Sequence, residues 1–105
     1  MAKKHLLNMN ILLTGSNGFL GKIIMTELQN EFRILTLSRK SGEYRVCLDL
    51  EVPIFRETFD LVIHAAGKAH IVPRTESERK QFYDANVIGT ENLLKGLERK
   101  GIPKQ

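Results

Sequence analysis

Residues 11–21, which read Ile-Leu-Leu-Thr-Gly-Ser-Asn-Gly-Phe-Leu-Gly, constrain the fold of this chain more than any other stretch. An apolar run precedes Gly15, Gly18 and Gly21, and a helical pattern of apolar residues follows them. A short apolar run without polar alternation is typical of a parallel strand that is covered on both faces. A strand, a glycine-rich turn and a helix in this order indicate a phosphate-binding junction and hence a dinucleotide site.

Each of the three glycines has a physical task in such a junction. The first suits a turn too tight for a side chain, the second permits close approach to a pyrophosphate, and the third lets the helix pack closely on the strand. A helix that begins near Gly18 directs free N–H groups and the positive end of its dipole at the phosphates. The alternative, an ordinary glycine-rich turn, is disfavoured by the placement of the glycines between a strand and a helix.

The rest of the chain alternates between strand and helix patterns. We expect strands over residues 10–14, 33–37, 44–48 and 60–64, and helices over residues 18–30 and 75–99. In the first helix, the apolar face is expected to consist of Leu20, Ile23, Ile24 and Leu28. The second helix begins with the capping-box spacing of Thr75 and Glu78. Between these elements, residues 38–43 form a polar loop, and Pro53 marks a turn or a short helix start.

This alternation predicts an α/β fold, a partial Rossmann fold in which a doubly wound parallel sheet of about four strands has the order 3-2-1-4. The fourth strand then lies at an edge, although Leu61, Val62 and Ile63 are typical of the middle of a sheet. An unpaired edge of this kind favours self-association or pairing with a partner chain. A length of 105 residues allows one domain.

Composition excludes several function classes. The net charge of +4 comes from scattered cations, and no recognition motif accompanies them, so we expect no nucleic-acid partner. No segment has the length of a membrane span. The single cysteine, Cys47, fits a reducing cytoplasm and is interpreted as a small buried apolar residue in a strand and not as a reactive thiol. The spacings of His5, His64 and His70 match no metal motif, and we interpret His64 as structural rather than catalytic.

Several motifs in this order resemble the extended short-chain dehydrogenase/reductase family, the NAD(P)-dependent sugar-nucleotide epimerases, dehydratases and reductases. The first is Thr-Gly-x-x-Gly-Phe-Leu-Gly, which departs from the commoner Gly-x-Gly beginning of dinucleotide sites. Asp49-Leu50 follows the third strand, and His64-Ala65-Ala66-Gly67 ends the fourth. The sequence Asn-Val-x-Gly-Thr-x-Asn-Leu-Leu lies in the long helix at residues 86–94.

The resemblance implies roles for individual residues. The turn around the pyrophosphate would be formed by Gly15, Ser16, Asn17, Gly18, Phe19 and Leu20. Asp49 and Leu50 would contact the adenine, and Ala65, Ala66 and Gly67 would lie under the nicotinamide and its ribose. The alternatives are a capping or turn aspartate at position 49 and a simple strand-end turn at 65–67.

The choice between NAD and NADP depends on the end of the second strand. An acidic residue there would bind the ribose hydroxyls of NAD and repel the additional phosphate of NADP. Here Ser38, Arg39 and Lys40 follow Leu37, so NADP is the preferred cofactor over NAD, the alternative being that the two cations are only solvated loop charges.

Catalysis in this family uses a Tyr-x-x-x-Lys pair, whereas Tyr44 and Tyr83 are followed four residues later by Leu48 and Val87. We therefore expect residues 1–105 to be an incomplete NAD(P)-binding Rossmann domain without the substrate domain, the N-terminal portion of a sugar-nucleotide epimerase/dehydratase/reductase-like protein, inactive alone and with no catalytic residue. The alternative is a non-catalytic NADP-binding regulatory or interaction module that pairs with another chain.

Overall fold

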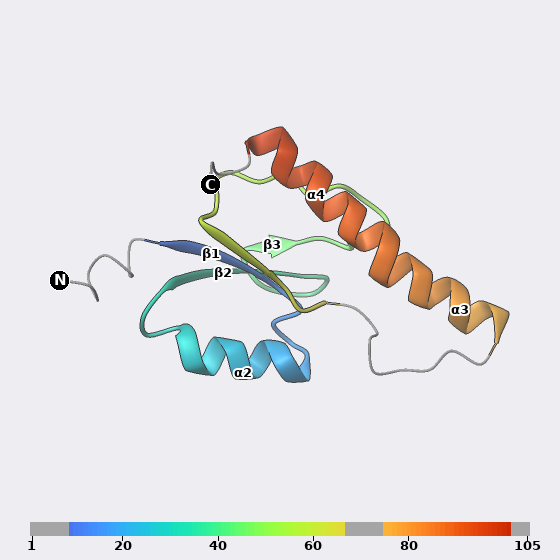
Figure 1. The fold of residues 1–105 in the computed structure, drawn as a ribbon, viewed down its shortest axis with the longest axis horizontal. Coiled ribbons are helices and arrows are strands. Elements are labelled where there is room, and N and C mark those ends of the chain that lie inside the picture. Colours follow the sequence, from blue (N-terminus) through green and yellow to red (C-terminus); the bar gives the residue numbers. More distant parts are fainter. Residues whose placement is uncertain (1–8, 67–74, 102–105) are drawn as a thin grey trace.

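A parallel sheet with helices on both of its faces forms the framework of the chain (Figure 1). The computed structural model describes residues 9–66 and 75–101. The strand order β3-β2-β1-β4 confirms the expected α/β topology. In chain order the elements are β1 (Asn10–Thr14), α2 (Phe19–Leu28), β2 (Arg33–Ser38), β3 (Tyr44–Arg45), β4 (Leu61–His64), α3 (Glu76–Tyr83), the π-helical η1 (Asp84–Ile88) and α4 (Gly89–Lys100).

Side chains alternate between the two faces of the sheet. Leu12 of β1 pairs in register with Leu35 of β2 and Val62 of β4; Leu12 and Leu35 belong to the core that α4 covers, and the partly buried Val62 packs against it. Ile11 and Leu13 point to the opposite face, beside α2, and are also fully buried. The core on the α4 side also contains the buried residues Leu37, Tyr44, Leu48, Phe55, Phe59 and Leu93.

The apolar face of α2 differs from the one expected from the sequence. Ile24 and Leu28 are partly buried, but Leu20 and Ile23 are 56% and 46% exposed, and Phe19 is 85% exposed. The prediction that Leu20 and Ile23 face the sheet was therefore wrong.

Contact between backbones fixes the rotation of α2. A Cβ on Gly21 would lie 1.9 Å from the carbonyl oxygen of Gly15 and 2.8 Å from the Cα of Ser16. Gly21, the buried residue of this helix, must therefore face the end of β1. Because successive helical residues are rotated by about 100°, Leu20 is turned away from the sheet.

The strand expected over residues 44–48 is only two residues long, Tyr44–Arg45. On the side of β2 that faces β3, the Glu43 carboxylate accepts hydrogen bonds from the Thr36 N–H and hydroxyl, both at 2.8 Å. The Glu43 carboxylate thus takes the place of a backbone carbonyl from a neighbouring strand as the hydrogen-bond acceptor for the Thr36 N–H. Beyond β3 the chain turns toward α4, where the Asn92 amide donates to the Leu48 carbonyl at 2.6 Å.

The long C-terminal helix is interrupted by a π-helical turn. Thr75 caps its first turn by accepting a hydrogen bond from the Glu78 N–H at 3.0 Å, as the capping box predicted. The single α-helix expected over residues 75–99 is instead α3, η1 and α4 in succession. Gly96 of α4 packs against Pro53, where an added Cβ would lie 2.6 Å from the Pro53 carbonyl oxygen. Pro53 itself lies in the segment that connects β3 to β4 and does not begin a helix.

Strand β4 is an edge of the sheet formed by the described residues, as expected. It pairs with β1 alone within that sheet, and Leu61 is 47% exposed. Its apolar residues therefore border an unpaired backbone edge.

We predict that Glu43→Ala lowers the free energy of unfolding by about 1–2 kcal/mol, because the Thr36 N–H loses its acceptor. Burial raises the pKa of Glu43, but hydrogen bonds from Thr36 outweigh it, and the pKa is lowered overall. The contribution is therefore present at neutral pH and disappears as the pH falls through this lowered pKa. Urea denaturation at pH 7 and pH 3 measures both effects.

The matched control is Glu51→Ala, which removes an exposed carboxylate from the segment that follows β3. Equal losses of stability for the two variants at pH 7 would contradict this role of Glu43.

Candidate functional site

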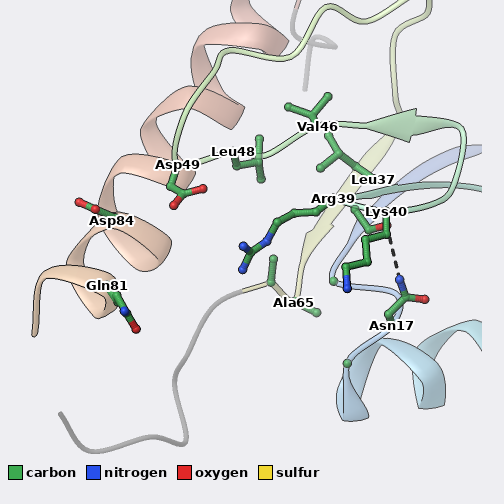
Figure 2. A pocket seen from close by; sticks show the side chains of 14 residues that line it. Asn17, Leu37, Arg39, Lys40, Val46, Leu48, Asp49, Ala65, Gln81 and Asp84 are labelled. Carbon is green, nitrogen blue, oxygen red and sulfur yellow. Dashed lines mark hydrogen bonds between the residues drawn. The ribbon is translucent and has the colours of Figure 1, made fainter. Parts of the chain in front are cut away.

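A cavity of about 620 Å³ lies at the carboxyl ends of the parallel strands, between the glycine turn and the α3–η1 helix (Figure 2). Ligands of open α/β sheets bind at this end, where the chain crosses from one face to the other. The lining residues are Gly15, Asn17, Gly18, Leu37, Ser38, Arg39, Lys40, Val46, Leu48, Asp49, Ala65, Ala66, Gln81 and Asp84.

The glycine turn is held tightly against the end of β4. Gly15 has a φ of +73°, which favours glycine, and an added Cβ would lie 2.6 Å from the Ala66 nitrogen and 2.7 Å from the Ala65 carbonyl carbon. Gly18 differs, because among the described parts of the chain its added Cβ would meet only the Gly15 oxygen, at 3.4 Å. The packing of the protein itself thus requires a glycine at position 15, whereas at Gly18 the backbone is uncovered and borders the cavity.

The first turn of α2 leaves backbone donors at this bare surface. Gly18 is the N-cap residue, and the first intrahelical bond of the turn runs from the Lys22 N–H to the Gly18 carbonyl at 3.0 Å. The N–H groups of Phe19 and Leu20 precede that bond and are among the free donors of a helix start. Within α2 no side chain caps this end, and its first turn contains no carboxylate that would compete with an anion. The residues present therefore fit a phosphate group.

Asn17 connects the glycine turn to the loop after β2. Its amide nitrogen donates to the Ser41 hydroxyl at 3.2 Å and to the Ser38 hydroxyl at 3.5 Å. Ser38 in turn donates to the Ser41 carbonyl at 2.7 Å and accepts from the Ser41 N–H at 3.1 Å. The loop that presents Arg39 and Lys40 is therefore folded onto the turn.

Charges of both signs surround the cavity. Figure 2 shows the Arg39 side chain extending into the cavity, with Asp49 and Asp84 on one side and Lys40 and Asn17 on the other. Asp84 is neutralised by Lys80, whose Nζ lies 2.7 Å from the carboxylate. Arg39 and Lys40 therefore remain as the cations that face the cavity from the loop.

Asp49 accepts a hydrogen bond from the Cys47 thiol, with 2.7 Å between Sγ and Oδ1. This hydrogen bond lowers the pKa of Asp49, and Arg39 lowers it further, so the carboxylate is ionised at neutral pH. The same hydrogen bond, followed by burial, raises the pKa of Cys47, so the thiol stays protonated. Cys47 is only partly buried and lies beyond β3, so its interpretation as a buried strand residue was wrong.

Most of the sequence-predicted site residues meet in this cavity. Those that line it are Gly15, Asn17, Gly18, Ser38, Arg39, Asp49, Ala65 and Ala66. The lining does not include Ser16, Phe19, Leu20 or Leu50, and the side chains of the last three are strongly exposed. Gly67 lies outside the described residues.

Five further residues line the cavity although no site role was expected for them from the sequence: Leu37, Val46, Leu48, Gln81 and Asp84. Val46 and Leu48 alternate with more polar positions after β3, which is a weak signal for a shared face. Gln81 and Asp84 carry no local signal, because only the packing of the long helix over the sheet brings them here.

We also searched the described residues for a metal site, a membrane span and a second cavity. Among residues 9–66 and 75–101, no group of three or more His, Cys, Asp or Glu side chains could hold a metal ion. Within the same ranges, every helix is too short or too polar to cross a bilayer. A shallower hollow of about 500 Å³ lies on the outer side of α2, lined by Phe19, Lys22, Ile23, Thr26 and Glu27.

Comparison with known proteins assigns the sequence to a family. The family model described as "NAD dependent epimerase/dehydratase family" matches residues 11–104. UDP-glucose 4-epimerase of Vibrio cholerae is 28% identical over 90% of this chain and 33% of its own length. Sterol-4-alpha-carboxylate 3-dehydrogenase, decarboxylating, of Dictyostelium discoideum is 33% identical over 81% of this chain and 29% of its own length.

A third relative, N-acetyl-alpha-D-glucosaminyl-diphospho-ditrans,octacis-undecaprenol 4-epimerase of Escherichia coli O157:H7, is 26% identical over 91% of this chain and 30% of its own length. The chain therefore spans about a third of the length of these curated relatives. Among solved structures, the protein lin1944 from Listeria innocua matches with a TM-score of 0.68 and 22% identity, over 90% of this chain and 51% of that chain. This likeness supports the fold.

Proposed function

The chain belongs to the NAD dependent epimerase/dehydratase family, and we propose that its 105 residues bind the nicotinamide dinucleotide for which the family is named. The observation that carries the proposal is the bare backbone at Gly18. Among residues 9–66 and 75–101, a Cβ there would meet a single atom within 4 Å, while Gly15 and Gly21 are enclosed by backbone. Since Gly18 lines the cavity at the start of α2, the open space suits a pyrophosphate against the helix N–H groups.

The remaining lining residues would hold the two ends of the dinucleotide. We assign the adenine to the side where Asp49 lies, with the carboxylate as the hydrogen-bond acceptor and Leu48 as an apolar contact. Leu50 would contribute through its backbone, since its side chain is 79% exposed. The nicotinamide and its ribose would lie over Ala65 and Ala66, where small side chains leave room for a ring.

We propose NADP as the preferred cofactor. Arg39 and Lys40 line the cavity directly after β2, and the Ser38 hydroxyl lies beside them. A guanidinium with two parallel N–H groups suits a 2′-phosphate, and charged hydrogen bonds of this kind are stronger than neutral ones. The Asp49 carboxylate lines the same cavity but already accepts a hydrogen bond from the Cys47 thiol.

We propose that hydride transfer on a nucleotide sugar, the chemistry that the family resemblance implies, requires residues that this sequence does not contain. A bound nicotinamide ring supplies the hydride acceptor or donor. Tyr44 does not suit the role of the catalytic tyrosine, because its hydroxyl donates to the Glu57 carboxylate and its ring packs on Phe55 and Phe59. Tyr83 is 53% exposed and has Val87 four residues later instead of lysine. The 105 residues would thus bind and orient the cofactor without turning over substrate.

Replacing Gly18 with alanine tests the proposed pyrophosphate site. The methyl group fits the protein, at 3.4 Å from the Gly15 oxygen, but occupies the space assigned to the phosphates. We expect isothermal titration calorimetry to show NADPH affinity weakened about tenfold or more, equivalent to about 1.4 kcal/mol, while urea denaturation shows little change.

Ser16→Ala is the control, because it alters the same turn at a side chain that does not line the cavity. Unchanged NADPH affinity in Gly18→Ala, or no saturable binding of either coenzyme to the folded wild-type chain, would refute the proposed function.

Arg39→Ala tests the cofactor preference. We expect NADPH affinity to fall about tenfold because a charged hydrogen bond to the 2′-phosphate is lost, while NADH affinity stays within about twofold. Parallel calorimetric titrations with the two coenzymes measure the ratio. Arg99→Ala, which removes an exposed cation from the last turn of α4, controls for net charge. Equal losses for both coenzymes would show that Arg39 does not recognise the 2′-phosphate.

A further inference from the structure

His64, the last residue of β4, has both ring nitrogens in hydrogen bonds beneath the cavity. Its Nδ1 lies 2.5 Å from the Thr14 hydroxyl at the end of β1, and its Nε2 lies 3.0 Å from the Thr90 hydroxyl of α4. The ring is half-buried, and the next two residues, Ala65 and Ala66, form the cavity lining at this point.

The neighbouring bonds define the protonation state of the ring. Thr90 donates its hydroxyl proton to the Asn86 carbonyl at 2.9 Å, so it must accept the Nε2–H of His64. Thr14 accepts the Ala66 N–H at 3.3 Å and retains its own proton for Nδ1. Each group then donates and accepts consistently, provided that His64 is neutral and carries its proton on Nε2.

This chain of hydrogen bonds connects three parts of the site. It runs from the Ala66 backbone through β1 and β4 to the Asn86 carbonyl in η1. Ala66 is also the residue against which Gly15 packs without a Cβ. The imidazole therefore joins the floor of the cavity to the helix that forms its opposite wall.

We infer that neutral His64 is a positioning residue that holds the Ala66 backbone in place for cofactor binding, and that its protonation weakens binding of the dinucleotide. The inference rests on the proposed function and adds a pH-dependent control of the same site. A protonated ring donates from both nitrogens, so Thr14 would receive two N–H groups while its own proton loses the Nδ1 acceptor. The Thr14 oxygen has two lone pairs and can accept both N–H groups, but its side chain is fully buried, so the hydroxyl proton must turn away from the ring toward another acceptor. This reorientation changes the geometry of the hydrogen bond that holds the Ala66 N–H.

The surroundings favour the neutral ring. Burial lowers the pKa of His64. The groups that contact it from β1 and α4 are the two threonine hydroxyls, which carry no charge. The charged residues on the packed elements are engaged or exposed: Asp84 of η1 pairs with Lys80, and Glu91 of α4 is exposed. Protonation therefore occurs below the ordinary histidine range and adds a charge that no described residue in contact with the ring compensates.

The test compares the full 105-residue chain with His64→Phe, which keeps an aromatic ring but cannot titrate. NADPH affinity is measured by calorimetry at pH 7.5 and pH 5.0. Because the 2′-phosphate itself titrates near pH 6, the informative quantity is the ratio of the two proteins' affinities at each pH. We expect the ratio of wild-type to His64→Phe affinity for NADPH to be about fivefold or more smaller at pH 5.0 than at pH 7.5.

A second pair of variants covers the case in which His64→Phe does not fold. Thr90→Val removes the partner of Nε2, and Thr26→Val removes the equivalent hydroxyl from α2, where Thr26 donates to the Lys22 carbonyl four residues earlier at 2.9 Å. We expect NADPH binding to weaken about threefold or more in Thr90→Val alone, with the pH at which binding is half lost shifted relative to wild type.

An NMR readout separates this inference from the proposed function. In the ligand-free chain, the Ala66 amide resonance should move with the same midpoint as the His64 ring, and the movement should be smaller in Thr14→Val, which removes the hydroxyl that joins the ring to the Ala66 N–H. An Ala66 amide that is insensitive to the wild-type His64 titration would overturn the inference, as would an unchanged affinity ratio. Absence of NADPH binding at every pH would overturn the proposed function, and the Ala66 resonance would still decide the role of His64.

Discussion

The close approach of three backbone segments, at Gly15, Gly21 and the end of β4, is the constraint on which the rest of the structure depends. No side chain larger than hydrogen fits at Gly15 or Gly21, because backbone atoms lie within 3 Å of each added Cβ. This contact ends β1, sets the rotation of α2, and places the helix start beside the cavity. The exposure of Leu20 and Ile23 is a consequence of that rotation and not an independent feature of the helix.

The walls of the cavity depend on polar side chains that replace regular backbone pairing. Glu43 takes the place of a strand partner for Thr36, which allows the chain after β2 to loop outward and present Arg39 and Lys40. Asn17 ties that loop to the glycine turn. On the other side, His64 joins β4 to α4 through Thr90. The framework is therefore held by apolar packing, whereas the shape of the site depends on a few directional hydrogen bonds.

The sequence was sufficient for the elements with strong local signals. The apolar run before Gly15, the capping box at Thr75 and the alternation of strands and helices gave the topology, which the structure confirms. The family resemblance was confirmed as well. The length of β3 and the face of α2 were misjudged because a carboxylate and a backbone contact, neither of which follows a period of two or 3.6, decide them. Gln81 and Asp84 could not be predicted, since only tertiary packing carries the helix over the sheet.

The most direct test of the central claim is to map NADPH on the ¹⁵N-labelled chain by following backbone amide resonances during titration. Binding at the glycine turn predicts the largest shifts at the amides of Gly18, Phe19 and Leu20, although the side chains of the last two do not line the cavity. Shifts centred on Lys22, Ile23 and Thr26 would instead place the coenzyme in the hollow on the outer side of α2. That result, or the absence of any saturable shift, would contradict the account.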